Sequence, residues 1–231
     1  MTNFTLIIPL YNEESNIELL FQELLNAKVE DFVSNIIFVN DGSTDNTLSI
    51  LKKINKNYSK VTILNNKKNF GQSYSIYQAI KIAKTKYIIT LDGDLQNDPN
   101  DITKLIEKIN VNVALVAGIR KKRKDNFIKI LSSKIANSVR NFFLQDGCID
   151  TGCSLKIFDK EIFLSYKFFD GIHRFIPALF KAKNKNIIYV DVNHRHRIKG
   201  VSKYGTLDRL AVGIRDLIKV YLIIRKVKKF H

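Results

Sequence analysis

Short apolar runs alternate with amphipathic stretches through the first half of the chain. The apolar runs lack a helical period and are rich in β-branched residues, so they predict buried strands at Phe4–Pro9, Asn35–Asn40, Val61–Leu64, Lys86–Leu91 and Val113–Ala117. The stretches between them predict helices at Ser15–Ala27, Thr44–Lys53, Ser73–Lys84 and Pro99–Ile109. Alternation of this kind is typical of βαβ units, and it predicts an α/β fold with a mostly parallel sheet flanked by helices.

Beyond residue 118 the pattern changes to longer amphipathic helices and basic segments. A helix is predicted from about Asn126 to Leu144, and a last helix begins near residue 206, where apolar residues follow i, i+3, i+4, i+7 spacing. Basic stretches at 120–124 and 193–205 precede these two helices. We therefore expect a main domain at 1–205 and a C-terminal amphipathic basic helix at 206–231. Such a helix suits a membrane interface, although packing on the sheet is the commoner use of an apolar stripe.

The chain is strongly basic: its 231 residues include 38 Lys and Arg against 22 Asp and Glu, giving a formal net charge of +16. This excess predicts an anionic partner, namely nucleic acid, an acidic membrane surface or a phosphorylated substrate, unless it reflects only a lysine-rich composition. No apolar stretch is long enough to span a bilayer, and no N-terminal signal pattern is present. The two cysteines lack metal-binding spacing, so we expect free thiols and a cytoplasmic protein.

Two acidic residues separated by one glycine follow the predicted strand at Lys86–Leu91. Because a parallel strand presents its carboxyl end at the ligand-binding edge of an open sheet, Asp92 and Asp94 are expected at that edge. Carboxylates there, with Gln96 as a third oxygen donor, suit Mg²⁺ or Mn²⁺ shared with substrate phosphates. Taken alone, Asp-Gly is also ordinary turn chemistry, so this motif needs support from the rest of the chain.

That support comes from three further motifs, each expected at the same edge of the sheet. Pro9-Leu-Tyr-Asn-Glu-Glu14 ends the first strand, Val39-Asn-Asp-Gly-Ser-Thr-Asp45 ends the second, and Asn69-Phe-Gly-Gln72 precedes the third helix. Together with Asp92-Gly-Asp94, this ordered set resembles the family 2 inverting glycosyltransferases. The resemblance covers about the first half of the chain and implies a GT-A (Rossmann-like) nucleotide-sugar domain.

Motifs in the second half narrow the resemblance to one branch of that family. The motifs Asp150-Thr-Gly-Cys-Ser-Leu-Lys156, Asp170-Gly-Ile-His-Arg-Phe-Ile-Pro-Ala-Leu179 and Arg197-x-x-Gly-x-Ser-Lys-Tyr204 look like those of dolichol-phosphate mannosyltransferases and undecaprenyl-phosphate sugar transferases. The resemblance implies transfer of a sugar from a nucleotide diphosphate to the phosphate of a polyprenyl lipid, with inversion. A phosphate acceptor is already anionic, so such an enzyme needs little or no general base.

The resemblance also assigns roles in donor binding. It implies that Asp41 hydrogen-bonds the nucleotide base, and that the nucleotide-sugar pocket further includes Pro9, Tyr11, Asn12, Glu13, Gly71 and Asp92. The metal ligands implied for Mg²⁺ or Mn²⁺ are Asp92, Asp94 and Gln96.

Acceptor residues are implied in the same way. Arg120 and Lys134 match cations near the phosphates, and the predicted catalytic set is Asp94, Arg120, Lys134 and Arg197. The residues implied for the acceptor phosphate are Lys134, Ser138, Arg197, Ser202 and Lys203, with His194 and Arg195 in support. His173 either contacts phosphate or has a structural role, and the structural role is favoured.

Rival functions make different demands on the sequence. A family 2 enzyme with a soluble or glycan acceptor would need a general base and would have no use for two cationic segments around an amphipathic helix. A nucleic-acid-binding module would not place acidic turns at its ligand edge, so nucleic acid is not expected as a partner. A membrane-binding scaffold without catalysis stays an alternative. We expect peripheral binding to an anionic membrane surface on its cytoplasmic face, or an anchor supplied by a membrane-protein partner.

Overall fold

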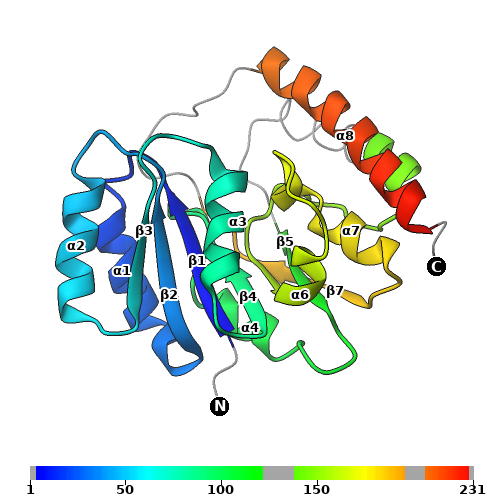
Figure 1. Ribbon diagram of the computed structural model, residues 1–231. Coiled ribbons are helices and arrows are strands. Elements are labelled where there is room, and N and C mark those ends of the chain that lie inside the picture. The colour runs from blue at the N-terminus through cyan, green and yellow to red at the C-terminus, as the bar shows by residue number, and fades with distance from the viewer. Residues whose placement is uncertain (1–3, 122–137, 196–205, 229–231) are drawn as a thin grey trace.

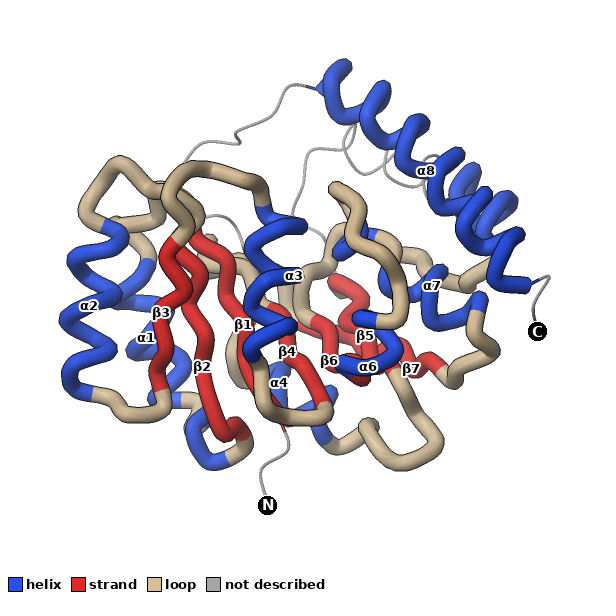
Figure 2. The backbone as a smooth tube through the Cα atoms, in the orientation of Figure 1, coloured by secondary structure: helices blue, strands red, loops and turns tan. Residues whose placement is uncertain are grey.

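A twisted sheet forms the centre of the molecule (Figures 1 and 2). Within residues 4–121, 138–195 and 206–228, which the computed structural model describes, seven strands pair in the order β3-β2-β1-β4-β6-β5-β7. The strands are β1 (Phe4–Leu10), β2 (Val33–Asn40), β3 (Val61–Asn65), β4 (Tyr87–Thr90), β5 (Leu115–Arg120), β6 (Lys156–Asp159) and β7 (Ile187–Val192). All pairs are parallel except those that β6 makes with β4 and β5.

Helices cover both faces of the sheet. They are α1 (Ile17–Asn26), α2 (Thr47–Asn57), α3 (Gln72–Ile82), α4 (Asp101–Ile106), α6 (Lys160–Leu164), α7 (Ile176–Ala182) and α8 (Thr206–Lys228), with short 3-10 segments η1 (Val29–Asp31) and η2 (Ile172–Arg174). Alternate residues of β1 enter opposite cores: Leu6 and Ile8 pack with α1, α2 and α4, whereas Ile7 packs with α3, α6, α7 and α8. The two-residue period of a strand thus builds a three-layer α/β structure.

The five strands expected from apolar runs are confirmed, with ends that shift by a few residues. β6 and β7 were not predicted. β6 is a four-residue strand with a charged residue at each end, and it runs antiparallel between β4 and β5. Its register places Lys156 beside Thr90 of β4 and Ala117 of β5. So short a strand is specified by its two neighbours rather than by its own pattern.

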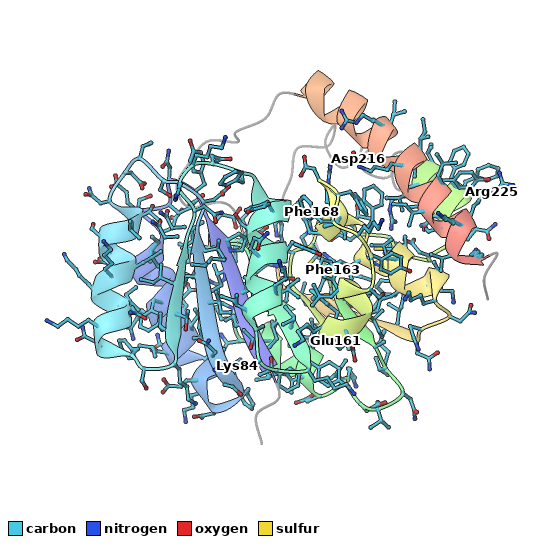
Figure 3. All side chains as sticks on the ribbon, viewed as in Figure 1. Lys84, Glu161, Phe163, Phe168, Asp216 and Arg225 are labelled. Carbon is cyan, nitrogen blue, oxygen red and sulfur yellow. The ribbon has the colours of Figure 1, made fainter. Side chains whose placement is uncertain are left out.

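The last helix is confirmed as α8, which lies against α7 (Figure 1). Val220 and Ile224 are buried in the same core as α7, and Arg174 of η2 forms an ion pair of 2.5 Å with the buried Asp216. Figure 3 shows Asp216 on the underside of the helix and Arg225 near its end. Of the other predicted helix, residues 138–144 are helical, and the rest lies outside the described residues.

Helix α8 and the 138–144 helix expose several apolar side chains. We call Phe142, Phe143, Ile214, Ile218 and Leu222 the apolar patch; their exposed fractions are 78, 47, 53, 57 and 58%. The aromatic rings of Phe143 and Tyr221 lie 6.1 Å apart, which joins the 138–144 helix to α8. No described helix is long and apolar enough to cross a membrane. Placement of α8 at a membrane interface, and the boundary at residue 205, stay predictions.

Candidate active site

Four segments from separate parts of the chain meet at one edge of the sheet. They enclose a pocket of about 180 Å³ that is lined by Pro9, Leu10, Tyr11, Glu13, Asp41, Asn69, Gly71, Gln72, Asp92, Gly93 and Asp94. The ends of β1, β2 and β4 supply most of these residues, and the loop before α3 supplies the rest. The four motifs therefore meet at one edge of the sheet, as the sequence predicts. Of the residues expected to bind the nucleotide-sugar, only Asn12 is not part of the lining.

Asp41 shapes one wall of this pocket through its carboxylate. Oδ1 accepts hydrogen bonds from the Phe70 amide at 3.0 Å and the Asn66 side chain at 2.8 Å, and Oδ2 accepts one from the Gly71 amide at 2.8 Å. The Asp41 amide in turn donates to the Leu10 carbonyl at 2.8 Å. Asp41 therefore fixes the loop before α3 onto the β2 end, and base recognition by Asp41 stays a prediction.

Asn12 holds two of the turns together. Its amide donates to Ser43 Oγ at 2.9 Å, and its side-chain oxygen accepts the Thr44 amide at 2.8 Å. The residue has a φ of +52°, a left-handed conformation that asparagine tolerates better than most residues. Asn12 thus joins the turn after β1 to the turn after β2, and both turns contribute residues to the pocket.

The acidic pair lies at the floor of the pocket. Asp92 Oδ1 accepts a hydrogen bond of 2.8 Å from Gln72 Nε2, and the Asp92 amide donates to Ser154 Oγ at 3.2 Å. Burial, and then the negative charge of Asp94, raise the pKa of Asp92 to about 6. Two neighbouring carboxylates in a partly desolvated site create a local excess of negative charge, which a bound cation would relieve.

These residues fit a divalent metal. Magnesium in enzymes is often held by one or two protein carboxylates, with substrate phosphates and water completing the shell. Asp92 and Asp94 supply that donor set, whereas no group of three or more His, Cys, Asp or Glu in the described ranges could hold a metal ion by itself. Gln96 lies outside the lining: its Nε2 donates to the Arg195 carbonyl at 3.4 Å, and its amide donates to Asp94 Oδ1 at 3.2 Å.

The predicted acceptor residues are only partly described. Arg120, at the end of β5, is paired with Asp150 through two side-chain hydrogen bonds of 2.7 Å. Ser138 is an exposed residue of the 138–144 helix and does not line the pocket. Lys134, Arg197, Ser202 and Lys203 lie outside the described residues. The acceptor side of the predicted site therefore stays a prediction.

His173 is joined to α3 at the edge of the site. Ser73 Oγ accepts a hydrogen bond from the Gly171 amide at 2.7 Å and forms a second one with His173 Nδ1 at 2.8 Å. Burial, together with the charges of Arg174 and Lys156, lowers the pKa of His173 to about 3. His173 is therefore a neutral imidazole bonded to Ser73 of α3, and its structural role stays a prediction.

Sequence reasoning missed several residues that organise the site. Gln72 and Asn69 line the pocket, and Ser154 and Asp150 hold Asp92 and Arg120. All four lie within the motifs quoted above, and this position was the only indication in the sequence that they belong to the site. Their partners, however, are fixed by tertiary contacts.

Comparisons with known proteins agree with this geometry. The sequence profile described as glycosyl transferase family 2 matches residues 5–166. The chain belongs to glycosyl transferase family 2. The recognition made from the four strand-end motifs is thereby confirmed.

Two relatives of this family 2 chain point to the expected branch. The chain is 35% identical over 227 residues to the dodecaprenyl-phosphate galacturonate synthase of Rhizobium johnstonii, covering 96% of this chain and 67% of the relative. It is 31% identical over 208 residues to the undecaprenyl-phosphate 4-deoxy-4-formamido-L-arabinose transferase of Pectobacterium carotovorum subsp. carotovorum, covering 89% of this chain and 63% of the relative. The chain thus spans about two thirds of the length of these relatives.

The fold is also found in solved structures. Glucosyl-3-phosphoglycerate synthase from Mycobacterium tuberculosis, in complex with Mn²⁺, UDP and phosphoglyceric acid, superposes with a TM-score of 0.70. The match covers 96% of this chain and 78% of that one at 17% sequence identity. At this identity the likeness concerns the fold, and it confirms the expected GT-A architecture.

Proposed function

We propose that this family 2 glycosyltransferase moves a sugar from a nucleotide-diphosphate sugar to the phosphate of a polyprenyl phosphate, with inversion at the sugar. The observation that carries the proposal is the position of Asp92 and Asp94 in one pocket with Tyr11, Glu13 and Asp41. Relatives named for transfer to dodecaprenyl and undecaprenyl phosphate support the choice of acceptor.

In the proposed reaction the pocket orients the donor. The wall that Asp41 fixes, together with Tyr11 and Glu13, surrounds the nucleoside, and Asp92 and Asp94 face the diphosphate. A Mg²⁺ or Mn²⁺ ion held by these two carboxylates would neutralise charge on the departing nucleoside diphosphate. The similar synthase binds Mn²⁺ together with UDP, which supports this choice of metal.

The acceptor phosphate would attack the anomeric carbon directly. A phosphate oxygen is negatively charged at neutral pH, so catalysis rests on alignment and on stabilising the leaving group rather than on a general base. We assign Arg120, whose guanidinium is bonded to Asp150 at the end of β5, to the acceptor side of the site. In this proposal Lys134, Ser138, Arg197, Ser202 and Lys203 complete the phosphate site.

Access to a lipid phosphate calls for a membrane contact. The apolar patch on α8 and the 138–144 helix would enter the interface, while Arg215, Lys219, Lys226 and Lys228 of α8 attract anionic headgroups. We place this contact on the cytoplasmic face of the membrane, where nucleotide sugars would be available. A membrane-protein partner could add a further anchor.

A transfer assay tests the proposal. The full chain is incubated with Mn²⁺, a panel of UDP- and GDP-sugars, and undecaprenyl phosphate in vesicles, and the lipid extract is analysed by mass spectrometry. We expect a polyprenyl monophosphosugar with one donor. The Asp94→Asn variant should lose at least about a hundredfold in rate, because charge stabilisation of a leaving group is typically worth that much or more.

The control is Asp31→Asn, which makes the same change at an exposed residue of η1 away from the acidic pair. It should retain full activity. Transfer at the wild-type rate by Asp94→Asn, or the absence of any lipid-linked sugar with every donor, would contradict the proposed function.

A further inference from the structure

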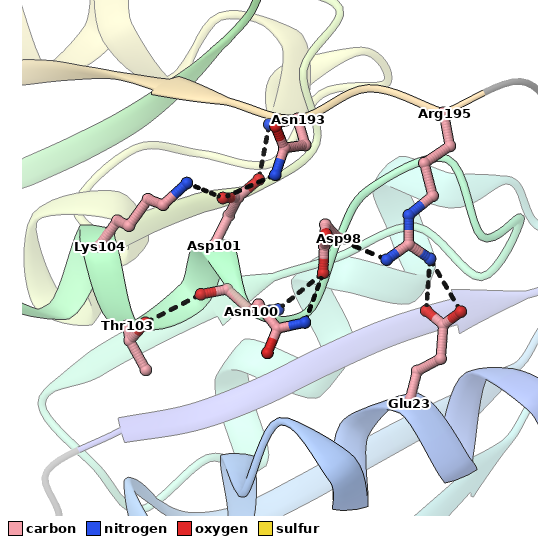
Figure 4. A network of polar contacts seen from close by, with 8 residues as sticks. All are labelled: Glu23, Asp98, Asn100, Asp101, Thr103, Lys104, Asn193 and Arg195. Atoms are coloured by element: carbon pink, nitrogen blue, oxygen red, sulfur yellow. Dashed lines mark hydrogen bonds and ion pairs between the residues drawn. The ribbon is translucent and has the colours of Figure 1, made fainter.

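Arg195 follows β7 and is held by two acidic residues from different parts of the fold (Figure 4). Its Nη1 donates to both carboxylate oxygens of Glu23 on α1 at 2.8 Å, and its Nη2 lies 3.0 Å from Asp98 Oδ2. The side chains of Arg195, Glu23 and Asp98 are 34, 22 and 16% exposed. One guanidinium nitrogen thus contacts both oxygens of Glu23 and the other contacts Asp98, in a half-buried setting where an ion pair contributes more than it does on an open surface.

The backbone of the same residue is fastened to the turn that follows the acidic pair. The Arg195 amide donates to the Gln96 carbonyl at 2.9 Å, and Gln96 Nε2 donates to the Arg195 carbonyl at 3.4 Å. Next to it, Asn97 and His194 form an antiparallel bridge. The turn at 94–98 is therefore held through both the main chain and the side chain of Arg195.

This turn needs external support. Leu95 has a φ of +62°, a left-handed conformation that costs a non-glycine residue about 1 kcal/mol or more. The Gln96 amide donates to Asp94 Oδ1, so the position of Gln96 also sets the orientation of the Asp94 carboxylate. A shift of the turn would move Asp94 away from the pocket that it lines.

The charges around Arg195 argue against a role as an acceptor-phosphate ligand. One guanidinium faces the carboxylates of both Glu23 and Asp98, so the local sum is negative. Binding a phosphate would require this cation to leave its carboxylate partners. A second anchor next to it, from the Asn193 amide to the buried Asp101 at 2.6 Å, holds the same stretch of chain (Figure 4).

We propose that Arg195 is a positioning residue: it clamps the 94–98 turn to α1 and thereby orients Asp94 for the donor diphosphate and its metal. The consequence for catalysis rests on the proposed function, whereas the clamp itself is a property of the fold. Glu23 of α1, which does not line the pocket, then supports the site through Arg195.

The test compares Arg195→Met, Glu23→Gln and the double variant. Amide hydrogen exchange at Gln96 and Arg195 should speed up about tenfold in each single variant, since a charge-assisted hydrogen bond of this kind is worth roughly one factor of ten or more. The double variant should be no faster than Arg195→Met, because the two residues act as one unit. Exchange at Phe70 and Gly71, which Asp41 holds, should not change.

A functional readout accompanies the exchange experiment. The Mn²⁺ concentration needed for half-maximal transfer should rise in both single variants, while the KM for polyprenyl phosphate stays constant. Glu18→Gln removes the same charge from an exposed position of the same helix and should behave as wild type. If Arg195→Met does not fold, Glu23→Gln alone still decides the matter.

Two results would overturn the clamp: unchanged exchange at Gln96 in Glu23→Gln, or a raised acceptor KM that is confined to Arg195→Met. Wild-type protein that transfers no sugar with any donor would instead refute the proposed function. The exchange rates would then still decide whether Arg195 holds the turn.

Discussion

At the scale of single residues, the protonation of Asp92 gives the most direct check on the site. In metal-free folded protein its pKa is raised to about 6 from 3.8, because of burial and the charge of Asp94. Between these values the folded state holds more protons than the unfolded state, so stability falls as pH rises through this window. Above pH 6 the full cost of the buried carboxylate is present.

We therefore expect Asp92→Asn to raise the thermal unfolding temperature by a few degrees at pH 7.5 with chelator present, and the gain should shrink toward pH 4. Differential scanning fluorimetry between pH 4 and pH 7.5 measures the unfolding temperature.

Asp45→Asn is a control, for which we expect the opposite change in stability. Burial alone would raise the pKa of Asp45, but hydrogen bonds from Thr47 and Glu14 bring it below its ordinary value. That variant should lose stability at pH 7.5, and a loss in both variants would contradict the account of Asp92.

The carboxylates themselves could be predicted from the sequence because their placement is local: each comes directly after an apolar strand. Their partners could not. Gln72 bonds Asp92 across 20 positions, Ser154 bonds it across 62, and Arg195 reaches Glu23 across 172. Such pairs exist only once the sheet order is set, and Arg195, read from sequence as support for the phosphate site, is engaged elsewhere for that reason.

At the scale of elements, the pocket wall depends on how closely two segments approach. Gly42, the second residue after β2, has a φ of +68°, and a Cβ there would lie 2.3 Å from the Lys68 carbonyl carbon and 2.6 Å from the Asn69 nitrogen. Backbone atoms cannot move aside as a side-chain end can. The loop before α3, which Asp41 holds, would be pushed from its place.

Gly42→Ala should therefore lower the free energy of unfolding by about 2–4 kcal/mol, combining left-handed strain with overpacking. The Gly42→Ala variant should also bind nucleotide more weakly in the presence of Mn²⁺.

Gly147→Ala is the matched control: the φ of Gly147 is +69°, but no described atom lies within 4 Å of the added Cβ. Strain alone should cost it about 1–2 kcal/mol. Urea denaturation measures both, and equal losses would show that the close approach is unimportant.

The elements were predicted as far as each carries its own periodicity. Five strands and the helices between them have clear patterns, and their existence was expected correctly. β6 has four residues, ends in Lys156 and Asp159, and reverses the direction of the sheet between β4 and β5. Nothing within that stretch encodes its neighbours. The sheet order β4-β6-β5 is a tertiary outcome of packing rather than a local one.

At the scale of the whole molecule, charge and apolar exposure coincide on α8. Ile214, Ile218 and Leu222 recur every fourth residue and are more than half exposed, while the basic residues Arg215 and Lys219 stand beside them. The net charge of +16 adds long-range attraction to any anionic surface. Together these features favour a bilayer over a nucleic acid as the binding partner, because a phosphate backbone offers no apolar environment in which the exposed side chains could be buried.

The final prediction concerns this surface. The double variant Ile218→Glu/Leu222→Glu should bind anionic phosphatidylglycerol vesicles at least tenfold more weakly than wild type in flotation. Each apolar side chain would otherwise contribute up to about 1.5–3 kcal/mol on burial, and each new carboxylate is repelled by the headgroups.

Val111→Glu is the control, because Val111 is 90% exposed and lies in the turn before β5. Wild-type binding should weaken with salt and on neutral vesicles, since the basic residues contribute through charge. Flotation of the double variant equal to that of Val111→Glu would exclude α8 as the membrane contact, and would require another segment to bring this glycosyltransferase to the proposed lipid acceptor.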